Sequence, residues 1–300
     1  MSHGLESPTD VPALAATQLS KRFNTRAALN GLDISVPAGS VTGLVGPNGA
    51  GKTTLMRAWL AFERPDSGSV AVAGVDPWRN RSRALRGIGY VPQSPAIYSG
   101  LSVDDQLRMA RGLRGDFDAD YARRRLDQLG IPLGQRAETL SGGQAAQLGL
   151  AVALGTRAKI LMLDEPLASL DPLARREFVQ VLLEAVRADG LTVLLSSHIV
   201  TDVEDACDRL AVLGNGKVLL DSALDVARLV HQLTDSEAAP DGATLVGSFK
   251  GNGNNRTMRL WRQQAPTGAP PVGTSPWGAS LEDVVLGYLA AGRGAIAEGR

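Results

Sequence analysis

The chain has 300 residues, enough for one large or two smaller domains with a full hydrophobic core. Its 31 basic and 31 acidic residues cancel, so the composition carries no global electrostatic signature of nucleic-acid binding. The one cysteine, Cys207, excludes an intrachain disulfide framework and fits a reducing compartment. We expect it to be a small buried apolar residue on a helix.

Neither a signal peptide nor a membrane span is predicted. Residues 1–10 are polar and lack an apolar core, and we expect residues 1–11 to form a flexible tail. The longest uncharged segments, such as Thr139–Thr156, are interrupted by Gly, Ser and Gln. They fall short of the ~20 mostly apolar residues that a spanning helix needs. These features predict a cytoplasmic protein.

The first motif is a glycine-rich loop of the form G-x-x-x-x-G-K-[ST], which lies between residues 12–43 and residues 68–75, the two stretches where antiparallel strands are expected. A strand at Ser40–Val45 and a helix at Lys52–Leu60 enclose it, which is the context that the motif requires. Backbone N–H groups and the positive end of the helix would bind the phosphates of ATP or GTP. Lys52 would reach the β- and γ-phosphates, and the Thr53 hydroxyl would hold Mg²⁺. The loop consists of Gly46, Pro47, Asn48, Gly49, Ala50, Gly51, Lys52 and Thr53, and Thr54 follows it.

A helical section is expected between this loop and a second glycine motif. Gln93 follows a short apolar strand, where its amide could complete a Mg²⁺ shell, and helices are predicted at Val103–Leu113 and Tyr121–Leu129. In Leu140–Gln144, Ser141 can cap a helix and leave N–H groups exposed toward an anion. Because the phosphate loop already holds the chain's own γ-phosphate, this second site would serve the nucleotide of a facing molecule.

Two apolar strands end in chemically reactive side chains. Lys159–Leu163 precedes Asp164, a candidate Mg²⁺ ligand, and Glu165, which could orient or deprotonate an attacking water. The strand that begins at Thr192 ends before His198, whose imidazole could donate to the γ-phosphate. The alternatives are a solvated strand end for the two acids and a structural role for the histidine.

The last part of the chain differs in character. Asn215-Gly216 predicts a hairpin that ends the first region near residue 222. A helix over 223–233, strands at Thr244–Phe249 and Thr257–Trp261, and a loop or linker over 264–275 follow. A terminal amphipathic helix would begin after Ser280, with Asp283 completing a near-capping box.

In this order the motifs resemble those of the ATP-binding cassette (ABC) ATPases over roughly residues 12–225. The resemblance implies an α/β P-loop NTPase with a RecA-like core, an antiparallel β-subdomain and a helical subdomain at about 94–156. Residues 12–222 would form the nucleotide-binding domain, and residues 223–300 a small α+β accessory extension. The role of that extension, structural or regulatory, is left open.

The resemblance also assigns roles by motif. Residues 46–54 match the Walker A loop, 140–144 the signature, 160–165 Walker B and 169–171 the D-loop, in which Asp171 would join the two sites of a dimer. Gln147 stands where the family usually has an arginine, which puts a contact behind the signature in doubt. The implied catalytic residues are Lys52, Gln93 (Q-loop), Glu165 and His198 (switch histidine). The implied metal ligands are Thr53, Gln93 and Asp164. The implied nucleotide-binding residues are Phe23 (stacking on adenine), Gly46, Pro47, Asn48, Gly49, Ala50, Gly51, Lys52, Thr53, Thr54, Ser141, Gly142, Gly143 and Gln144.

The function implied is that of a transporter ATPase with ATP and Mg²⁺ as cofactors. Two cassettes, a homodimer rather than a heterodimer, would close head to tail on ATP and drive a separate integral membrane permease at the inner face of the membrane. The segment Ala279–Leu286 is similar to the tail of an exporter branch that includes drug exporters, so we expect export of a small molecule. The alternatives are an importer ATPase and a soluble ABC ATPase acting on ribosomes or DNA. The single cassette and the short segment between Gln93 and Ser141 argue against a soluble ABC ATPase that acts on ribosomes or DNA. The substrate is not encoded in these motifs.

Overall fold

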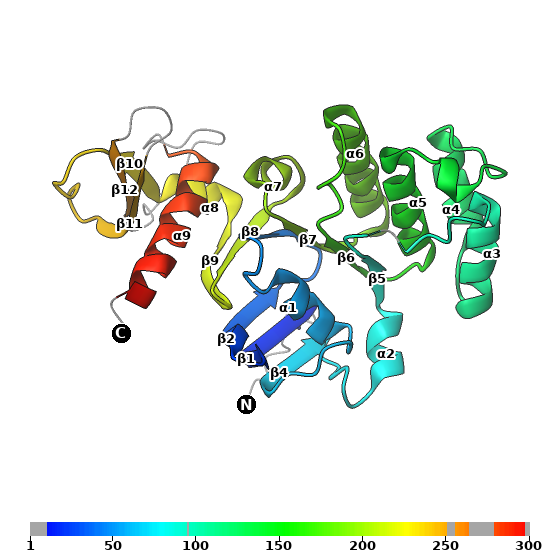
Figure 1. Cartoon of the computed structure of the whole chain (residues 1–300), viewed down its shortest axis with the longest axis horizontal. Coiled ribbons are helices and arrows are strands. Elements are labelled where there is room, and N and C mark those ends of the chain that lie inside the picture. The colour runs from blue at the N-terminus through cyan, green and yellow to red at the C-terminus, as the bar shows by residue number, and fades with distance from the viewer. Residues whose placement is uncertain (1–10, 95, 251–255, 264–278, 298–300) are drawn as a thin grey trace, which may run out of the picture.

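The computed structural model describes residues 11–94, 96–250, 256–263 and 279–297. These residues form an antiparallel sheet, a larger mainly parallel sheet and a small third sheet. A group of helices lies at one end of the molecule and the C-terminal elements lie at the other (Figure 1). No helix in the described ranges has the length and apolar character needed to cross a membrane.

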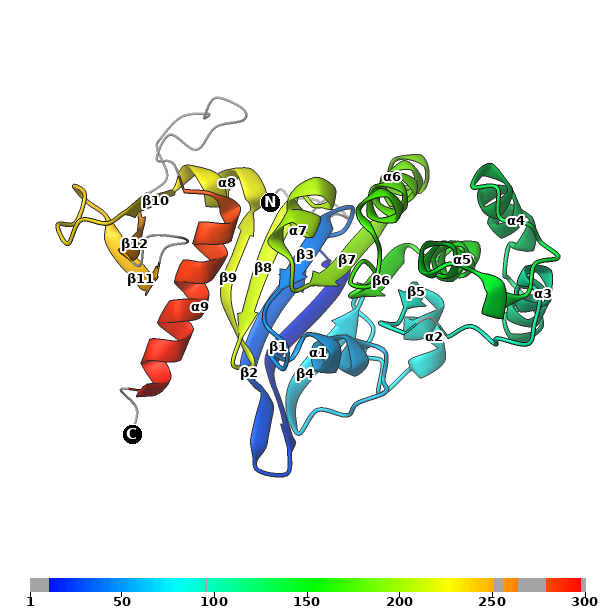
Figure 2. The same cartoon turned by 45° about the horizontal axis from the view of Figure 1, so that its top comes forward.

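The antiparallel sheet is built from the strands expected within residues 12–43 and 68–75. Its order is β2 (Arg26–Val36), β1 (Leu14–Phe23) and β4 (Ser67–Val72). Its inner face packs with helix α1 (Lys52–Trp59) into one apolar cluster, which contains the fully buried Trp59. Figure 2 shows α1 between this sheet and the larger one.

The larger sheet positions most of the predicted site residues. Its order is β5 (Ile88–Val91), β6 (Ile160–Asp164), β7 (Thr192–Ser197), β3 (Val41–Val45), β8 (Arg209–Gly214) and β9 (Lys217–Ala223). Every residue of β3, β6 and β7 is buried, as expected for parallel strands covered on both faces. The carboxyl ends of these three strands therefore meet at one edge, where ligands bind in such sheets.

The predicted hairpin is confirmed between β8 and its antiparallel edge strand β9. Asn215 and Gly216 have φ angles of 51° and 72°. Positive φ at both central residues is typical of a type I′ turn, and Asn-Gly tolerates it at low steric cost. Local sequence alone is sufficient to specify this turn.

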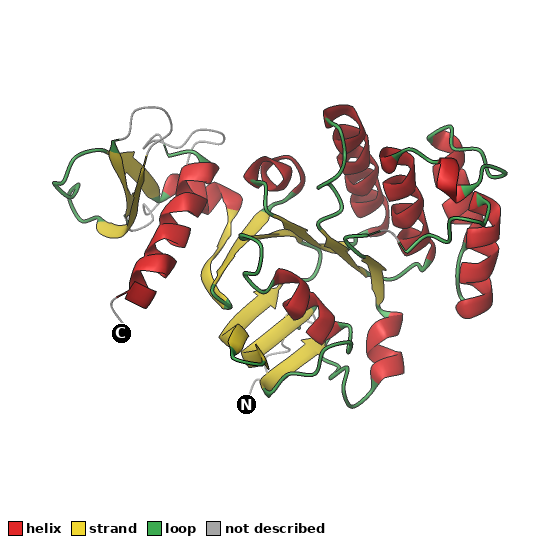
Figure 3. Ribbon diagram, viewed as in Figure 1, coloured by secondary structure: helices red, strands yellow, loops and turns green. Residues whose placement is uncertain are grey.

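Helices cover the larger sheet on the face away from the antiparallel sheet (Figure 3). Helices α5 (Gly142–Gly155) and α6 (Pro172–Asp189) share one apolar cluster with strands of the sheet, and α7 (Val200–Ala206) packs beside β3. Helix α3 occupies the predicted range Val103–Leu113, whereas α4 runs from Ala119 to Gln128. Both pack against α5. Two shorter elements are α2 (Arg81–Arg86) and the 3₁₀ turn η1 (Ala137–Thr139).

The C-terminal elements correct one prediction. The expected helix over 223–233 is wrong beyond Leu229, because α8 (Leu224–Leu229) is followed by β10 (His231–Thr234). Strand β10 pairs with β12 (Thr257–Arg262), which also pairs with β11 (Thr244–Lys250). The backbone of β10 is thus satisfied by a strand distant in sequence, which local helix propensity does not reveal.

The terminal helix α9 (Leu281–Ala297) begins where its cap predicts. The amide of Asp283 donates to Ser280 Oγ at 3.1 Å, and the amide of Ser280 donates to an Asp283 oxygen at 3.0 Å. Leu281 and Val284 of α9 share an apolar cluster with Val203 of α7. The predicted loop over 264–275 and residues 1–10 of the predicted tail over 1–11 lie outside the described residues. The proposed boundary near residue 222 stays a prediction.

Candidate nucleotide site

The phosphate loop between β3 and α1 has the backbone that its glycines predict. Gly49 and Gly51 have φ angles of 78° and 110°, and a Cβ on Gly51 would lie 2.5 Å from the carbonyl oxygen of Ala28. Helix α1 starts without a side-chain cap, so its first N–H groups are open toward an anion. Lys52 is buried and donates from Nζ to the Gly46 carbonyl at 2.7 Å. The loop is therefore arranged to hold a phosphate chain.

A cluster of oxygen atoms lies beside this loop at the ends of β6 and β7. The Thr53 hydroxyl donates to Asp164 Oδ1 at 3.2 Å, and the Ser196 hydroxyl donates to the same oxygen at 2.8 Å. The amide of Glu165 in turn donates to Ser196 Oγ at 2.9 Å. Carboxylate and hydroxyl oxygens are the ligands that Mg²⁺ prefers. Two of the three predicted metal ligands, Thr53 and Asp164, are thus in contact.

Sequence reasoning missed two residues that face Asp164. Ser196 orients its carboxylate, and the pair Ser196-Ser197 directly before His198 was the signal that could have revealed it. Tyr90 lies on the neighbouring strand β5. Burial raises the pKa of its phenol to about 12, and the charge of Asp164 adds to that rise. Nothing in the local sequence distinguishes this tyrosine from an ordinary strand residue.

The Glu165 carboxylate lies between two nitrogen-bearing side chains. Its Oε1 is 3.0 Å from Lys52 Nζ and its Oε2 is 3.0 Å from His198 Nδ1. Glu165 has a φ angle of 48°, which is uncommon for a residue with a side chain. Burial by itself would raise the pKa of Glu165, but the bonds and charges of Lys52 and then His198 outweigh it and lower that pKa below its usual value. The carboxylate is therefore ionised at neutral pH.

Phe23 is connected to the phosphate loop through the hairpin that follows it. In that hairpin Phe23 pairs with Arg26, and an Arg26 guanidinium nitrogen donates to the carbonyl of Gly49 at 3.0 Å. The Phe23 ring is 45% exposed, and Lys21 Nζ lies 5.4 Å from its centroid. An exposed aromatic ring near the loop can offer its face to a base.

Gln93 is less closely integrated into the site. It lies two residues beyond the end of β5, at the same edge of the sheet as Asp164, and its side chain is exposed. Among the described residues no hydrogen bond joins it to Asp164 or to Thr53. Of the four predicted catalytic residues, the structure brings Lys52, Glu165 and His198 into contact and leaves Gln93 apart.

The second glycine motif starts α5 as predicted. Ser141 Oγ accepts a hydrogen bond from the amide of Gln144 at 3.2 Å, and the Gln144 side chain accepts one from the amide of Ser141 at 3.0 Å. A Cβ on Gly143 would lie 2.9 Å from Ala174 Cβ, so this end of α5 packs closely against the first turns of α6. Among the described residues no hydrogen bond or ion pair joins the segment to the phosphate loop. It presents a separate exposed helix start.

Asp171 caps α6 next to this segment. Its Oδ1 accepts hydrogen bonds from the amides of Leu173 and Ala174 at 2.9 and 3.0 Å. Gln147, one turn further along α5, is buried, and both of its amide atoms lack a hydrogen-bond partner within the described residues. In the described part of the chain, Gln147 therefore makes no side-chain hydrogen bond behind the second glycine motif, the place where its departure from the family pattern puts a contact in doubt.

Comparison with known proteins identifies the family. The family model described as "ABC transporter" matches residues 29–168. Three curated relatives align with this chain over different shares of their own lengths. The "Probable multidrug ABC transporter ATP-binding protein YbhF" of Escherichia coli is 39% identical over 67% of this chain and 36% of its own length. The "Lipopolysaccharide export system ATP-binding protein LptB" of Haemophilus influenzae is 32% identical over 69% of this chain and 88% of its own. The "Aliphatic sulfonates import ATP-binding protein SsuB 1" of Mesorhizobium japonicum is 36% identical over 79% of this chain and 89% of its own.

The fold agrees with this assignment. A solved structure of the ATP binding subunit of an ABC transporter superposes with a TM-score of 0.65 at 28% identity, covering 72% of this chain and 92% of that one. The predicted cassette fold is thereby confirmed, with its α/β core and antiparallel subdomain. The chain spans about a third (36%) of the length of YbhF. Together, the ordered motifs, the site geometry and these relatives show that the chain belongs to the ATP-binding proteins of the ABC transporter family, whose cassette is an ATPase domain.

Proposed function

We propose that this chain is the ATP-binding and ATP-hydrolysing subunit of an ABC transporter, and that it dimerises on ATP to drive a separate membrane permease. The observation that carries the proposal is the contact between Glu165, Lys52 and His198 beside the Thr53–Asp164 pair. An ionised carboxylate next to a phosphate loop can orient and deprotonate a water for attack on the γ-phosphate.

Nucleotide binding is assigned to the loop and to the aromatic ring beside it. The open N–H groups at the start of α1 and residues 46–54 would hold the phosphates, and Phe23 would stack on adenine. In this structure, Lys52 donates to the Gly46 carbonyl and pairs with Glu165. When it pairs with the β- and γ-phosphates instead, the carboxylate of Glu165 becomes available to a water.

The metal would be held by the hydroxyl of Thr53 and by Asp164, with Gln93 as a third ligand after a movement of its exposed side chain. The shared hydrogen bonds of Thr53 and Ser196 to Asp164 fit a hard cation, because three oxygens already converge there. Bound Mg²⁺ would neutralise charge on the β- and γ-phosphates during transfer. His198 would donate to the γ-phosphate and report its loss after hydrolysis.

The second cassette is proposed from the separate helix start at Ser141–Gln144. Its exposed N-terminal end, with no bond to this chain's phosphate loop, can receive the γ-phosphate of a facing copy. Asp171, the N-cap of α6, lies beside it and would connect the two sites across the interface. We propose a homodimer with two equivalent sites.

The proposed direction is export. It rests on the similarity of the Ala279–Leu286 segment to an exporter tail and on a relative named for lipopolysaccharide export. Import is the second candidate, because SsuB 1, a relative of similar identity, is named for import of aliphatic sulfonates. The permease would place the chain at the inner face of the membrane, and no nucleic-acid partner is proposed.

The first experiment compares wild type with Glu165→Gln. We expect the variant to bind ATP, to hydrolyse it about 10²- to 10⁴-fold more slowly, and to accumulate as an ATP-dependent dimer in size-exclusion chromatography. Glu177→Gln, an exposed acid on α6, is the matched control and should behave as wild type. Normal turnover by a Glu165→Gln variant that stays monomeric with ATP would refute the assignment.

The second experiment identifies the partner. Tagged Glu165→Gln chain with Mg-ATP is used to capture proteins from detergent-solubilised native membranes. We expect to recover a multispan membrane protein, and inside-out vesicles carrying that pair then report the direction of transport. Recovery of ribosomal or chromosomal proteins without a membrane partner would overturn the transport proposal and leave the ATPase chemistry intact.

A further inference from the structure

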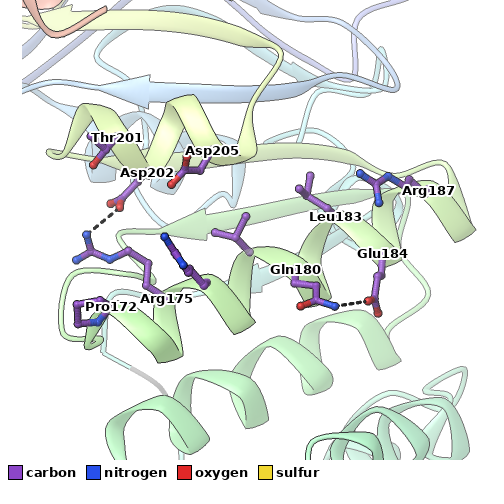
Figure 4. A pocket seen from close by; sticks show the side chains of 11 residues that line it. Pro172, Arg175, Gln180, Leu183, Glu184, Arg187, Thr201, Asp202 and Asp205 are labelled. Atoms are coloured by element: carbon purple, nitrogen blue, oxygen red, sulfur yellow. Dashed lines mark hydrogen bonds and ion pairs between the residues drawn. The ribbon is translucent and has the colours of Figure 1, made fainter.

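A groove of about 560 Å³ separates α6 from α7, and an ion pair spans one end of it (Figure 4). Arg175 lies in the first turns of α6, four residues after Asp171. Asp202 lies on α7, four residues after His198. The Arg175 guanidinium is 3.2 Å from Asp202 Oδ1, and the Asp202 side chain is only 2% exposed. Burying a carboxylate this deeply is costly, and removing its charged partner would be strongly destabilising.

Asp202 is also bonded to the segment that holds His198. Its Oδ2 accepts a hydrogen bond from Ser197 Oγ at 2.8 Å, and Ser197 Oγ accepts one from the amide of Ile199 at 2.9 Å. These bonds involve the residues on both sides of His198. The pairing of β7 with β3 holds the backbone up to Ser197, and because α7 starts without a side-chain cap at Ile199, this network adds the side-chain hydrogen bonds that hold the backbone beyond it.

The same guanidinium reaches toward the segment that follows Glu165. A second Arg175 nitrogen donates to the carbonyl of Leu167 at 3.4 Å. Arg175 therefore contacts both the chain that leaves Glu165 and the helix that follows His198. In the site, His198 Nδ1 lies 3.0 Å from Glu165 Oε2.

The ion pair does not use all the hydrogen-bonding atoms of its two side chains, so its geometry can change without breaking further hydrogen bonds at those atoms. Arg175 Nε and Asp202 Oδ1 are buried and make no well-directed hydrogen bond in the described part of the chain. The start of α6 packs against the second glycine motif through Gly143 and Ala174. A displacement of α6 at that surface would therefore reach Asp202, and through Ser197 it would reach His198.

We propose that Arg175 and Asp202 are positioning residues that hold His198 against Glu165 and make its position depend on the start of α6. This inference rests on the proposed ATPase function. Neither residue belongs to the proposed nucleotide site; both act through the Ser197 hydroxyl and the Ile199 amide bonded to it. Misplacing a catalytic group by about 1 Å can cost up to 10²-fold in rate, so loss of the pair should affect turnover more than ATP binding.

The test measures steady-state ATP hydrolysis by Asp202→Asn and Arg175→Ala. We expect each to lower kcat by about 10- to 100-fold while KM for ATP changes little, and Arg175→Lys to restore part of the loss. Arg176→Ala and Asp205→Asn are matched controls, because they remove exposed charges from the same helices and the same groove. Both controls should retain the wild-type kcat.

A second measurement separates positioning from a general loss of structure. In a His198→Ala background, Asp202→Asn should lower single-turnover hydrolysis no further, because the residue that it positions is absent. Ser197→Ala, which leaves the ion pair in place, should reproduce the loss of kcat in the wild-type background and serves where Asp202→Asn does not fold. An equal loss in both backgrounds, or a raised KM with unchanged kcat, would overturn the inference. Failure of Glu165→Gln to slow hydrolysis would instead refute the proposed function.

Discussion

Gly43, in the middle of β3, is expected to be intolerant of even one added methyl group. A Cβ at this position would lie 2.3 and 2.7 Å from the two methyl carbons of Val203 on α7, and 3.1 Å from its Cβ. Ordinary contacts begin near 3.4 Å. Gly43→Ala must therefore push α7 away from the sheet by about 1 Å, and overpacking of this kind costs about 1–3 kcal/mol of unfolding free energy.

The clash has a specific remedy that allows a double-mutant cycle. Val203→Ala removes the two methyl carbons that would collide, at a cost of about 2 kcal/mol for the lost burial and the cavity. In that background the two closest contacts of the new methyl group of Gly43→Ala are gone, and the Cβ of residue 203 remains 3.1 Å away. We therefore expect Gly43→Ala to cost at least about 1 kcal/mol less there than in wild type.

Urea unfolding of the four proteins without nucleotide measures this coupling. The midpoint and the m value together give the unfolding free energy of each variant. If Gly43→Ala destabilises the Val203→Ala background as much as wild type, α7 does not lie against β3 in the way that the structure describes.

Three further predictions concern the site and the helix behind it. The lowered pKa of Glu165 means that its ion pair stabilises the nucleotide-free chain above the ordinary glutamate pKa of 4.5 and that this stability is lost as the pH falls through the folded-state pKa. The difference in urea stability between wild type and Glu165→Gln should therefore shrink as the pH falls below the ordinary glutamate pKa of 4.5, and a difference that grows below pH 4.5 would contradict this reasoning. Phe23→Ala should weaken ATP binding in calorimetry by about 5- to 150-fold, the value of one base–aromatic stack, whereas Phe23→Tyr should retain the affinity; equal losses would exclude stacking. Gln147→Met should raise the unfolding free energy by about 1 kcal/mol, because it replaces two buried amide atoms that have no partner within the described residues. A loss of stability instead would reveal a partner for that amide in solution.

Most of the site motifs could be located from sequence because their signals are local. The phosphate loop depends on glycines at fixed offsets and on a lysine at the start of a helix, and the structure confirms the backbone that they require. The Asn215-Gly216 hairpin and the Ser280 cap were likewise predictable, because a turn or a cap is decided by a few neighbouring residues. The catalytic and binding roles assigned to these residues stay predictions until the variants are assayed.

The sequence by itself determined which strands are buried and which chemical groups follow them. Tertiary structure decided which of those groups meet. The order β6-β7-β3 brings Ser196 to Asp164 and His198 to Glu165, although more than thirty residues separate each pair. The Arg175–Asp202 pair and the pairing of β10 with β12 arise in the same way. Such contacts depend on burial and on hydrogen bonding between distant segments, and no local propensity encodes them.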